Sequence, residues 1–476
     1  MKRIITAAVF SLVGSSALAV PVNHPHGPNL TYGAVSNNQS IMSSVTNPAA
    51  GASVFTDEDS HYGFGVLSSI GVGVEFGQMD DFFTQFNDTK DTLTTTQILN
   101  FANIIQDPNT SIEEKAAQIA DQVNQTLINP TNELMTELAK DGYFKGTISG
   151  HAPIMPLVVT HKKLGGSFLF DINANVTTYL GLLADPINQI NGQDILSTVQ
   201  TATDNNQNDI NFDQFISSDS TAIVKGALVA EMSLGYSRSV WKHDNGPALQ
   251  TGELFAGVRA NYYRVGLTRF IQRLQDFTQD QSVDSVFSDR SGENYKESAG
   301  FGVDAGVVWV SKHYRAGATL NNITQPSFKY NSLNLNGYDP STDVYAELSK
   351  GEEYKMNRQL TLEGAVFTSN QNWVVAGSLD ANAVKDPVGQ DYKWLALSAA
   401  YATKSWWIPG ARVGFRSNLA GTKLNYVTAG TTLFKSLNLD IAYALNTVKV
   451  AKNDATSFTG EVPRSAIINL GLEFTF

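Results

Sequence analysis

The sequence has no cysteine in 476 residues. This absence excludes disulfide scaffolds, thiol catalysis, iron–sulfur clusters and zinc sites built from cysteine. Charged residues are also scarce, at 16%, whereas a soluble globular chain carries about 25%. The mean hydropathy is nevertheless −0.15. A chain with few charges that is still not apolar overall suits strands that are apolar on one face and polar on the other.

Beyond the first twenty residues the sequence also lacks any run of about 18 apolar residues, so no transmembrane helix is predicted. A membrane location would therefore require a closed β-barrel. The net charge is −12, which argues against nucleic acid as the main partner.

The first residues, MKRIITAAVFSLVGSSALAV, have the pattern of an export signal. Lys2 and Arg3 precede an apolar stretch of signal-peptide length, and Ala17-Leu18-Ala19 has the small-x-small pattern of a cleavage site. We expect cleavage near Ala19 and exclude residues 1–19 from the fold.

Alternating strands dominate the sequence from about residue 150. In KGALVAEMSLGYS, for example, Leu228, Met232 and Leu234 oppose Glu231 and Ser233. Many such segments of about ten residues indicate a transmembrane barrel. We expect strands near 61–77, 152–161, 166–183, 221–242, 253–270, 299–310, 313–321, 359–368, 371–382, 391–403, 408–417, 423–434, 437–447 and 464–476.

A soluble β-sandwich also alternates and is the competing interpretation. Aromatic residues favour the barrel, because rings near strand ends form an aromatic girdle; the candidates are Trp309, Trp373, Trp394, Tyr314 and Tyr443. The links between strands also alternate between shorter and mostly longer ones, with 418–422 as the exception. This matches the short periplasmic turns and long outer loops of such barrels.

The polar faces of these strands carry full charges of both signs, which the barrel places in its lumen. They are Glu231, Arg259, Arg315, Glu363, Asp380, Arg412, Arg416 and Asp440. Pairing inside a wet lumen is one interpretation and pore selectivity is another. Pairing is favoured, because an unpaired buried charge is costly and mixed signs make no clear filter.

Residues 79–147 predict a small helical insertion, placed at the outer face by the parity of the strands. Ser111 and Glu114 form a capping box before a helix whose face includes Ile119, Val123 and Leu127. NPTNELMTELAKDG predicts a second helix that ends at Gly142, and TTTQILNFANIIQD a weaker third.

A search for chemistry finds little. No metalloprotease, EF-hand or nucleophile-elbow pattern occurs. His24 and His26 are more simply part of a mobile N-terminal segment than a metal site. A hydrolase embedded in the barrel is the remaining enzymatic alternative, with His313 as its candidate residue. We therefore predict no enzyme, no cofactor and no metal.

Residues 44–53, SVTNPAAGAS, carry a family resemblance, together with the export signal, about fourteen strands and a final Phe476. The chain resembles the long-chain fatty acid transporter FadL superfamily, and more closely the exported conjugal transfer protein TraF family. The resemblance implies an N-terminal plug with Asn47, Pro48, Ala49 and Ala50 as its motif. The thioredoxin-like proteins that share the TraF name use a Cys-x-x-Cys motif, which this chain does not have.

The predicted fold is an all-β transmembrane antiparallel barrel of about 14 strands with an N-terminal plug segment and a small α-helical insertion. The ranges are 1–19 signal peptide, 20–60 plug-like segment, 61–78 first barrel strand, 79–147 helical insertion and 148–476 the rest of the barrel. In the last strand, Leu470, Leu472, Phe474 and Phe476 alternate with polar residues and resemble the signal that assembly machinery reads.

The predicted location is the Gram-negative outer membrane. Its lipid and its assembly machinery are the expected partners, and no nucleic acid binding is expected. The resemblance implies a channel-like or assembly component of conjugal transfer, with conjugation apparatus proteins as partners. A FadL-like transporter of small hydrophobic molecules, with a hydrophobic ligand, is the alternative.

Overall fold

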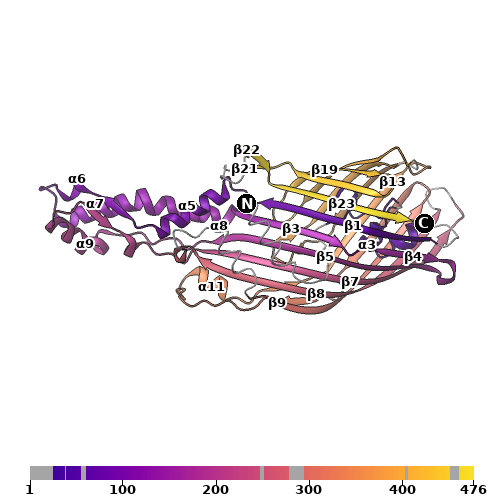
Figure 1. Cartoon of the computed structure of the whole chain (residues 1–476), viewed down its shortest axis with the longest axis horizontal. Coiled ribbons are helices and arrows are strands. Elements are labelled where there is room, and N and C mark those ends of the chain that lie inside the picture. Colours follow the sequence, from indigo (N-terminus) through magenta and orange to yellow (C-terminus); the bar gives the residue numbers. More distant parts are fainter. Residues whose placement is uncertain are drawn as a thin grey trace.

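A computed structural model describes residues 25–37, 39–54, 61–246, 251–277, 294–402, 406–450 and 460–476. The predicted signal peptide lies outside these ranges, as does part of the predicted plug segment. The molecule is a closed antiparallel β-barrel with helices inside it and a helical arm at one end (Figure 1). The predicted fold class is confirmed.

The barrel strands lie close to the predicted segments. They are β1 (His61–Phe76), β3 (Tyr143–His151), β4 (Leu157–His161), β5 (Gly166–Leu183), β7 (Thr221–His243), β8 (Gly252–Arg273), β9 (Lys296–Ser311), β10 (Tyr314–Asn321), β13 (Gln359–Phe367), β14 (Trp373–Asp380), β17 (Trp394–Tyr401), β18 (Gly410–Asn418), β19 (Asn425–Leu433), β20 (Leu437–Ala444) and β23 (Ser465–Thr475).

Neighbouring barrel strands pair in chain order, and β23 pairs with β1 to close the barrel. In this closing pair Phe64 lies opposite Phe474, and Val72 lies opposite Ile468. Closure leaves no free sheet edge, which is the requirement for a sheet that crosses a lipid bilayer.

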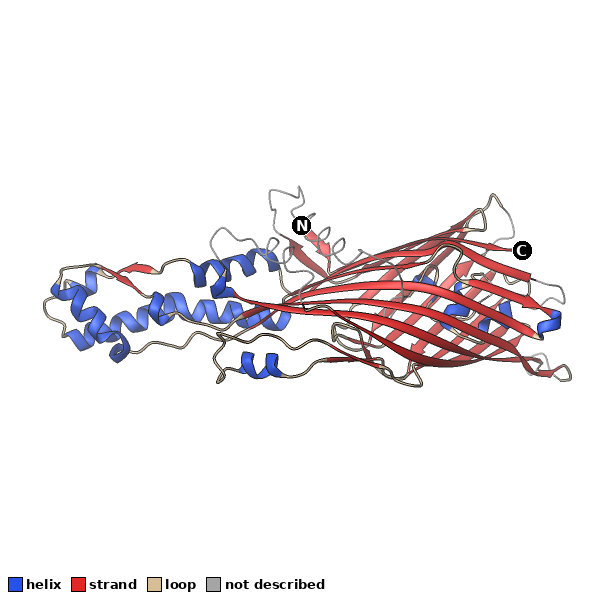
Figure 2. Cartoon of the chain, turned by 60° about the horizontal axis from the view of Figure 1, so that its bottom comes forward, coloured by secondary structure: helices blue, strands red, loops and turns tan. Residues whose placement is uncertain are grey.

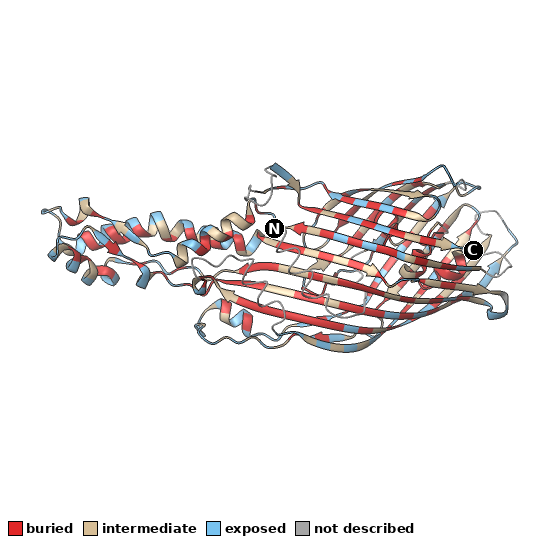
Figure 3. Cartoon of the chain, in the orientation of Figure 1, coloured by how far each residue is buried: buried red, intermediate tan, exposed pale blue. Residues whose placement is uncertain are grey.

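Strands such as β20 and β23 alternate between buried and exposed or half-buried side chains, whereas β8 is buried at every position over residues 265–271 (Figure 3). In the alternating strands the buried side chains point into the barrel. The exposed ones are large and apolar and form a band around its outside, for example Met232, Leu234, Val258, Phe301, Val307, Leu362, Val366, Val375, Leu397, Val413, Val427, Ile441, Ile468 and Leu470. Such a band is stable only against lipid.

One predicted girdle residue is wrong. Trp394 is only 8% exposed and lies in the lumen, where the Arg416 guanidinium sits 4.6 Å from its ring centroid. It is the first residue of β17 and lies at an inward-facing position. The presence of a large aromatic ring was therefore not a guide to the side of the wall on which it lies. Trp373 and Tyr443, by contrast, are exposed on the outside.

The two ends of the barrel differ. At the end where β23 finishes, the links are short, such as 312–313 and 434–436. At the other end they include 77–142, 184–220, 322–358 and 445–464. Figure 2 shows the helices of the arm at this second end and further helices inside the barrel near the first.

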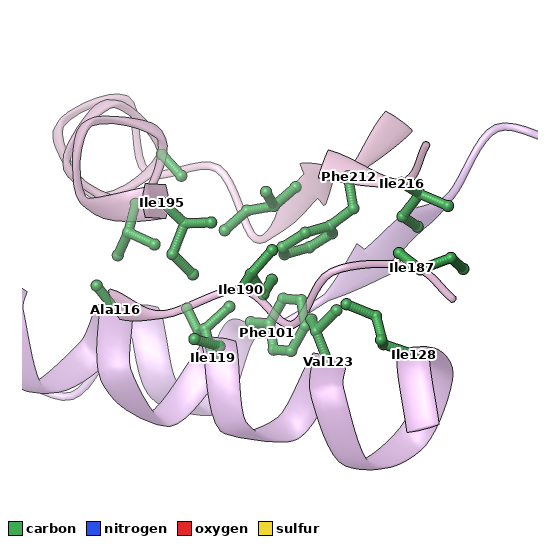
Figure 4. Close-up of a cluster of buried hydrophobic side chains, with 14 of the residues drawn as sticks. Phe101, Ala116, Ile119, Val123, Ile128, Ile187, Ile190, Ile195, Phe212 and Ile216 are labelled. Atoms are coloured by element: carbon green, nitrogen blue, oxygen red, sulfur yellow. The ribbon is translucent and has the colours of Figure 1, made fainter. Parts of the chain in front are cut away.

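The helical arm comprises residues 79–142 and 184–220. It contains α5 (Phe82–Thr94), α6 (Ala102–Ile105), α7 (Ile112–Val123), α8 (Asn129–Asp141), α9 (Gly192–Asp204) and a ribbon of β2 (Ile98–Asn100) with β6 (Asp209–Asn211). Ile119 and Val123 of α7 pack with Ile195 of α9 and with Phe212 in one apolar core (Figure 4). The segment 184–220 thus contributes buried side chains to the same core as the segment 79–142.

Two asparagines fasten the segments together. The side chain of Asn124 exchanges two hydrogen bonds with the backbone of Ile190, at 2.7 and 3.0 Å. Asn132 does the same with Ile187, at 2.9 and 2.8 Å. Each amide therefore takes the place of a neighbouring strand for an extended segment that runs along the helices.

The arm differs in detail from the predicted insertion. The capping box of Ser111 and Glu114 and the second helix are confirmed. A π-helical turn at Asn124–Ile128 shifts the buried face, so Ile128 is buried where Leu127 is only half-buried. The weak third helix is wrong over most of its length, because residues 98–100 form β2 and only 102–105 are helical. Helices α5 and α9 were not predicted.

The barrel wall is interrupted at one position. Two short strands, β3 and β4, together occupy one strand position between β1 and β5. Each of them pairs with β1 on one side and with β5 on the other. Residues 152–156, APIMP, separate the two strands. Opposite them β1 has a bulge between Val66 and Ile70. The wall there is joined by isolated hydrogen bonds, such as the one from Ser68 Oγ to the Met155 carbonyl at 2.6 Å.

No helix in the described part of the chain combines the length and the apolar character needed to cross a membrane.

Candidate functional site: the plugged lumen

Three short helices fill the lumen near the end of the barrel where β23 finishes. They are α2 (Asn29–Tyr32), α3 (Met42–Thr46) and α4 (Ala50–Val54). Most of their residues are buried, including Leu30 and Met42, which have no exposed surface. We call residues 25–54 the plug.

The motif Asn47-Pro48-Ala49-Ala50 forms the turn that starts α4. Asn47 Oδ1 accepts a hydrogen bond from the Ala49 amide at 2.9 Å, and the Asn47 carbonyl accepts one from the Ala50 amide at 2.9 Å. This side chain therefore caps the helix in the usual manner of asparagine. Its amide nitrogen is left free to bond to the barrel.

The barrel makes room for this turn with two glycines. A Cβ atom at Gly306 of β9 would lie 2.0 Å from Asn47 Oδ1, and one at Gly257 of β8 would lie 2.2 Å from the Pro48 carbonyl oxygen. No side chain fits at such distances. The motif and these two wall positions are thus complementary.

All eight predicted lumen charges are buried in the barrel, each less than 9% exposed. Four of them bond directly to the plug. Glu363 accepts hydrogen bonds from the Ser36 hydroxyl at 2.7 Å, from the Ser36 amide, and from Asn47 Nδ2 at 2.5 Å. Arg416 donates to the carbonyls of Asn29 and Leu30, at 3.1 and 3.0 Å.

Asp440 and Arg259 complete this set. Asp440 accepts a hydrogen bond from the Thr31 hydroxyl at 2.6 Å, and Arg259 donates to the Val45 carbonyl. The lumen charges therefore hold the plug through its backbone, its small hydroxyl groups and the side-chain amide of Asn47. The plug itself contributes no Asp, Glu, Lys or Arg to this interface.

Some of the eight also pair with one another or with neighbours. Arg412 forms an ion pair with Asp440 through two nitrogens, one of them at 2.7 Å. Arg259 pairs with Asp304 at 2.7 and 3.0 Å.

The remaining three are Asp380, Glu231 and Arg315. Asp380 accepts a hydrogen bond from Thr361 at 2.8 Å, and Glu231 accepts one from Ser233 at 2.6 Å. Among the described residues, Nε and Nη1 of Arg315 have no hydrogen-bond partner.

Sequence reasoning missed several residues of this site. Glu473 of β23 accepts hydrogen bonds from the Ser40 hydroxyl and from the Ile41 amide, both at 2.8 Å. Its inward register was visible in the sequence, but its contacts with Ser40 and Ile41 of the plug were not.

A second missed group is histidine-rich. The rings of His26 and His151 meet edge to face at 4.8 Å, and His151 Nε2 lies 3.5 Å from Asp171. The prediction of a mobile segment at His26 is wrong, because this residue is 6% exposed. In the described ranges, no three His, Asp or Glu side chains are grouped so that they could hold a metal ion.

His313, the candidate of the enzymatic alternative, lies in the turn between β9 and β10 and is half-buried. Its carbonyl accepts a hydrogen bond from the Phe367 amide at 2.9 Å. In the described part of the chain, its imidazole has neither an acid nor a hydroxyl as a hydrogen-bond partner. The arrangement of a nucleophilic triad is therefore not found at His313.

Two loops cover the lumen at the opposite end from the plug. We call residues 322–358 and 381–393 the cap. Tyr330 donates a hydrogen bond to the Pro387 carbonyl at 2.6 Å, which joins the two loops. Asp386 forms an ion pair with Lys145 of β3, and Glu352 lies 3.0 Å from Arg269 of β8. The cap is thus fixed to the wall by buried charges.

A cavity of about 130 Å³ lies between the plug and the cap. Its lining comes from the plug (Asn29), from the cap (Tyr354) and from barrel strands on opposite sides of the lumen (Asn173, Trp394). Most of the lining side chains are polar or charged. The plug and the cap thus leave only a small space between them in the lumen.

The residues of the predicted assembly signal lie on the outer face of β23. Leu470 is 46% exposed and Phe476 is 58% exposed, while Leu472 and Phe474 are half-buried. The Phe476 ring stacks on Tyr62 at 5.4 Å and on Phe64 at 5.9 Å. These rings bind the last strand to the first at the barrel rim.

Comparison with solved structures finds other barrels at low similarity. The Pseudomonas putida toluene transporter TodX is 11% identical with a TM-score of 0.38, covering 97% of this chain and 99% of that one. The Ralstonia pickettii toluene transporter TbuX is 12% identical with a TM-score of 0.37, covering 96% and 98%. TM-scores this low are too weak to carry a function from those proteins to this chain.

Among curated proteins, none matches the chain with significance. The family described as the F plasmid transfer operon protein TraF matches residues 44–380, which is more than half of the chain. The match begins at the plug helix before Asn47 and extends through most of the barrel. The resemblance predicted from the sequence is thereby confirmed: the chain belongs to the F plasmid transfer operon TraF protein family.

Proposed function

We propose that the protein is a plugged, non-enzymatic outer-membrane barrel that serves conjugal transfer as an assembly or contact component, through its helical arm. The family to which the chain belongs supports the association with plasmid transfer. The observation that carries the proposal is the concentration of negative charge in the arm.

The barrel itself supports a membrane location. It is closed, and large apolar side chains are exposed around its outside. In water such a surface would aggregate, whereas in a bilayer it is matched to the acyl chains. The proposed membrane is the outer membrane of a Gram-negative cell, reached by export and cleavage of residues 1–19.

The arm differs from the barrel in charge. Its two segments, 79–142 and 184–220, contain seventeen Asp and Glu residues and three Lys, a net charge of −14. The rest of the chain after residue 19 contains twenty-eight acidic and twenty-eight basic residues. The net charge of the mature chain therefore resides in the arm, while the barrel is balanced.

The lengths of the links between strands support a position of the arm on the outer side of the membrane. Barrels of this type have short turns toward the periplasm and long loops toward the exterior. The arm grows from the end with the long links. It then projects from the cell surface, where a charged, separately folded unit can meet components of the transfer apparatus or of the recipient cell.

The lumen supports a contact role over that of an open pore. The plug is fixed by Glu363, Arg416 and Glu473, and the cap is fixed by Asp386 and Glu352. A permeant would have to displace both. An assembly component needs no such displacement.

The test removes charge from the arm and leaves its core intact. Four carboxylates are exposed on α7 and α8 and form no ion pair within the described part of the chain: Glu113, Asp121, Glu133 and Glu137. Replacing them by Gln or Asn lowers the negative charge of the arm by four. We expect the frequency of plasmid transfer to fall, while the barrel keeps its heat-dependent gel mobility.

The matched control is Glu347→Gln with Glu353→Gln in the cap at the same end of the barrel. Transfer by the arm variant at the frequency of the unaltered protein would refute a role for the charge of the arm. Loss of transfer in both would indicate a general effect of surface charge.

A second candidate is transport of small hydrophobic molecules. The interruption of the wall between β3 and β4, opposite the bulge of β1, supports it, because a side exit would need a break of this kind. The small volume of the cavity, about 130 Å³, counts against a long acyl chain. Uptake of a radiolabelled long-chain fatty acid by cells with and without the gene separates the candidates: equal uptake with lost transfer removes the second.

A further inference from the structure

The ribbon of β2 and β6 on the arm has an open edge beside a groove. β6 pairs with β2 on one side, and its other side pairs with no strand of the described chain (Figure 2). We infer that an extended peptide segment of a partner protein, rich in Lys or Arg, binds along this edge as a third strand. The inference names a class of partner for the arm and rests on the proposed contact role for its biological use.

The backbone of β6 presents free groups at this edge. In an antiparallel pair, alternate residues exchange hydrogen bonds, and the residues between them direct their backbone groups away from the partner strand. The Asn208 carbonyl accepts a hydrogen bond from the Phe101 amide at 2.8 Å, which fixes this alternation. The amides and carbonyls of Asp209 and Asn211 therefore face away from β2, and they have no partner in the part of the chain that the structure describes. An added strand would satisfy them.

A groove of about 600 Å³ lies along the open edge, between β6 and α9. The side chains that α9 contributes to it are small: Ser197, Thr198, Thr201 and Ala202. They leave room for a peptide backbone at the spacing of neighbouring strands, about 4.7–4.9 Å. Pockets for drug-sized ligands measure about 300–1,000 Å³. The groove is thus large enough for a few residues of an extended chain.

The charge of the groove favours a basic peptide. Asp209 and Asp213 line it with exposed side chains. Each accepts one hydrogen bond, from Asn100 Nδ2 at 2.8 Å and from the Gln97 amide at 2.7 Å, and neither forms an ion pair within the described ranges. The segment 184–220 contains six Asp and no Lys or Arg. Lys or Arg at alternate positions of an added strand would lie on the same face as the Asp209 side chain.

The same charge decides against other occupants. A second copy would bring its own acidic edge, and like charges on neighbouring strands destabilise the pair. Nucleic acid is repelled for the same reason. On the other edge of the ribbon, the Ile98 amide already donates a hydrogen bond to the Thr96 carbonyl at 3.3 Å. β6 therefore offers the freer edge.

The test measures the fluorescence anisotropy of a labelled synthetic peptide, Thr-Lys-Val-Lys-Thr-Lys, with the purified full-length protein in non-ionic detergent. One control peptide has Glu in place of each Lys, and the other keeps Lys but carries methyl groups on its backbone nitrogens. We expect saturable binding of the first peptide. Both controls should bind about tenfold more weakly or worse, because one is repelled and the other cannot donate backbone hydrogen bonds.

Two matched pairs of variants locate the site. Asn211→Pro removes an amide at the open edge, where proline is tolerated, whereas Asn211→Ala keeps that amide and loses the same side-chain bond from the Asp213 amide. The proline variant should bind the peptide about tenfold more weakly than the alanine variant. Asp209→Asn should weaken binding about two- to fivefold. Asp88→Asn, at an exposed position of α5 outside the groove, should not weaken it.

Three results would overturn the inference: no saturable binding of the basic peptide, equal binding of the methylated peptide, and equal binding by the two Asn211 variants. The helical circular dichroism signal verifies that the arm of every variant is folded. The frequency of plasmid transfer with the α7 and α8 variants tests the proposed function separately. Peptide binding can fail while transfer still depends on the charge of the arm, and transfer can be unaffected while the peptide binds, so the two failures are distinguishable.

Discussion

Glu363 is the wall residue through which the plug can be released with one substitution. It lies on β13, is 8% exposed, and accepts hydrogen bonds from the amide and hydroxyl of Ser36 and from the amide of Asn47. Arg315 is its buried neighbour on β10. Glu363→Ala therefore leaves three plug donors without an acceptor and one arginine without its countercharge.

The magnitude follows from these contacts. A hydrogen bond to a charged group contributes about 1.5–3 kcal/mol, and the plug loses three of them. The interaction of Glu363 with Arg315 lies within the wall, so its loss affects the closed and the released states alike. The bonds are not additive, so we expect release of the plug to become easier by about 3–5 kcal/mol in total. At 1.4 kcal/mol for each factor of ten, the released population rises roughly a hundred- to several-thousandfold.

The assay uses the absence of cysteine. Ser44 of α3 is 1% exposed, and its hydroxyl has no hydrogen-bond partner among the described residues. Ser44→Cys therefore introduces one thiol at little cost in the closed state. A maleimide reagent reacts only when the plug moves, so the labelling rate reports the released population when closing is fast.

Glu297→Ala is the matched control, since Glu297 lies on β9, pairs with the exposed Arg264 and does not touch the plug. Glu363→Gln should give an intermediate rate, because it keeps an acceptor and loses the charge. The reasoning is refuted if Glu363→Ala labels at the rate of the Glu297→Ala control while both proteins remain folded on gels.

Three further predictions follow from contacts elsewhere. Asn132→Leu removes two hydrogen bonds to the segment that joins the arm, so the helical circular dichroism signal should melt earlier by an amount that corresponds to about 2 kcal/mol. Phe476→Ala removes the stack on Tyr62, and a lower yield of heat-modifiable barrel than with Phe434→Ala would support its proposed role in assembly. Burial and neighbouring carboxylates raise the pKa of Asp185 from 3.8. Its protonation therefore stabilises the folded state at low pH, and this stabilisation is lost as the pH rises through the raised pKa. Thermal melts at several pH values should show this fall in stability, and Asp185→Asn should reduce the fall.

The barrel could be predicted from the sequence because its determinants are local. Alternation in segments such as 225–237 assigns each side chain to the inner or the outer face without knowledge of the neighbouring strands. A shift of one residue in the assignment would exchange the two faces, so the alternation leaves only two choices. Glu363 and Asp440 were placed on the inward face in this way. Trp394 was misplaced because its ring, and not its register, was used as the evidence.

The contacts of the lumen could not be predicted, because they join residues that are hundreds of positions apart. Glu473 and Ser40 form one example, and Arg259 with Val45 another. The plug segment has no periodicity of its own, so nothing local indicates that its backbone carbonyls and hydroxyls satisfy charges on the wall. The same holds for α9, whose apolar face makes sense only beside α7.

The distribution of charge links these observations. A lumen with unpaired charges would carry a large desolvation cost. Outside the arm and residues 1–19, acidic and basic residues are equal in number, so each charge can have a partner. That balance lets a neutral plug with carbonyls and hydroxyls fit between them. The excess of negative charge has no such partner within the barrel and is confined to the arm, where water and salt screen it. This separation of charge is the reason why we propose the arm, and not the lumen, as the part of the molecule that makes contacts outside it.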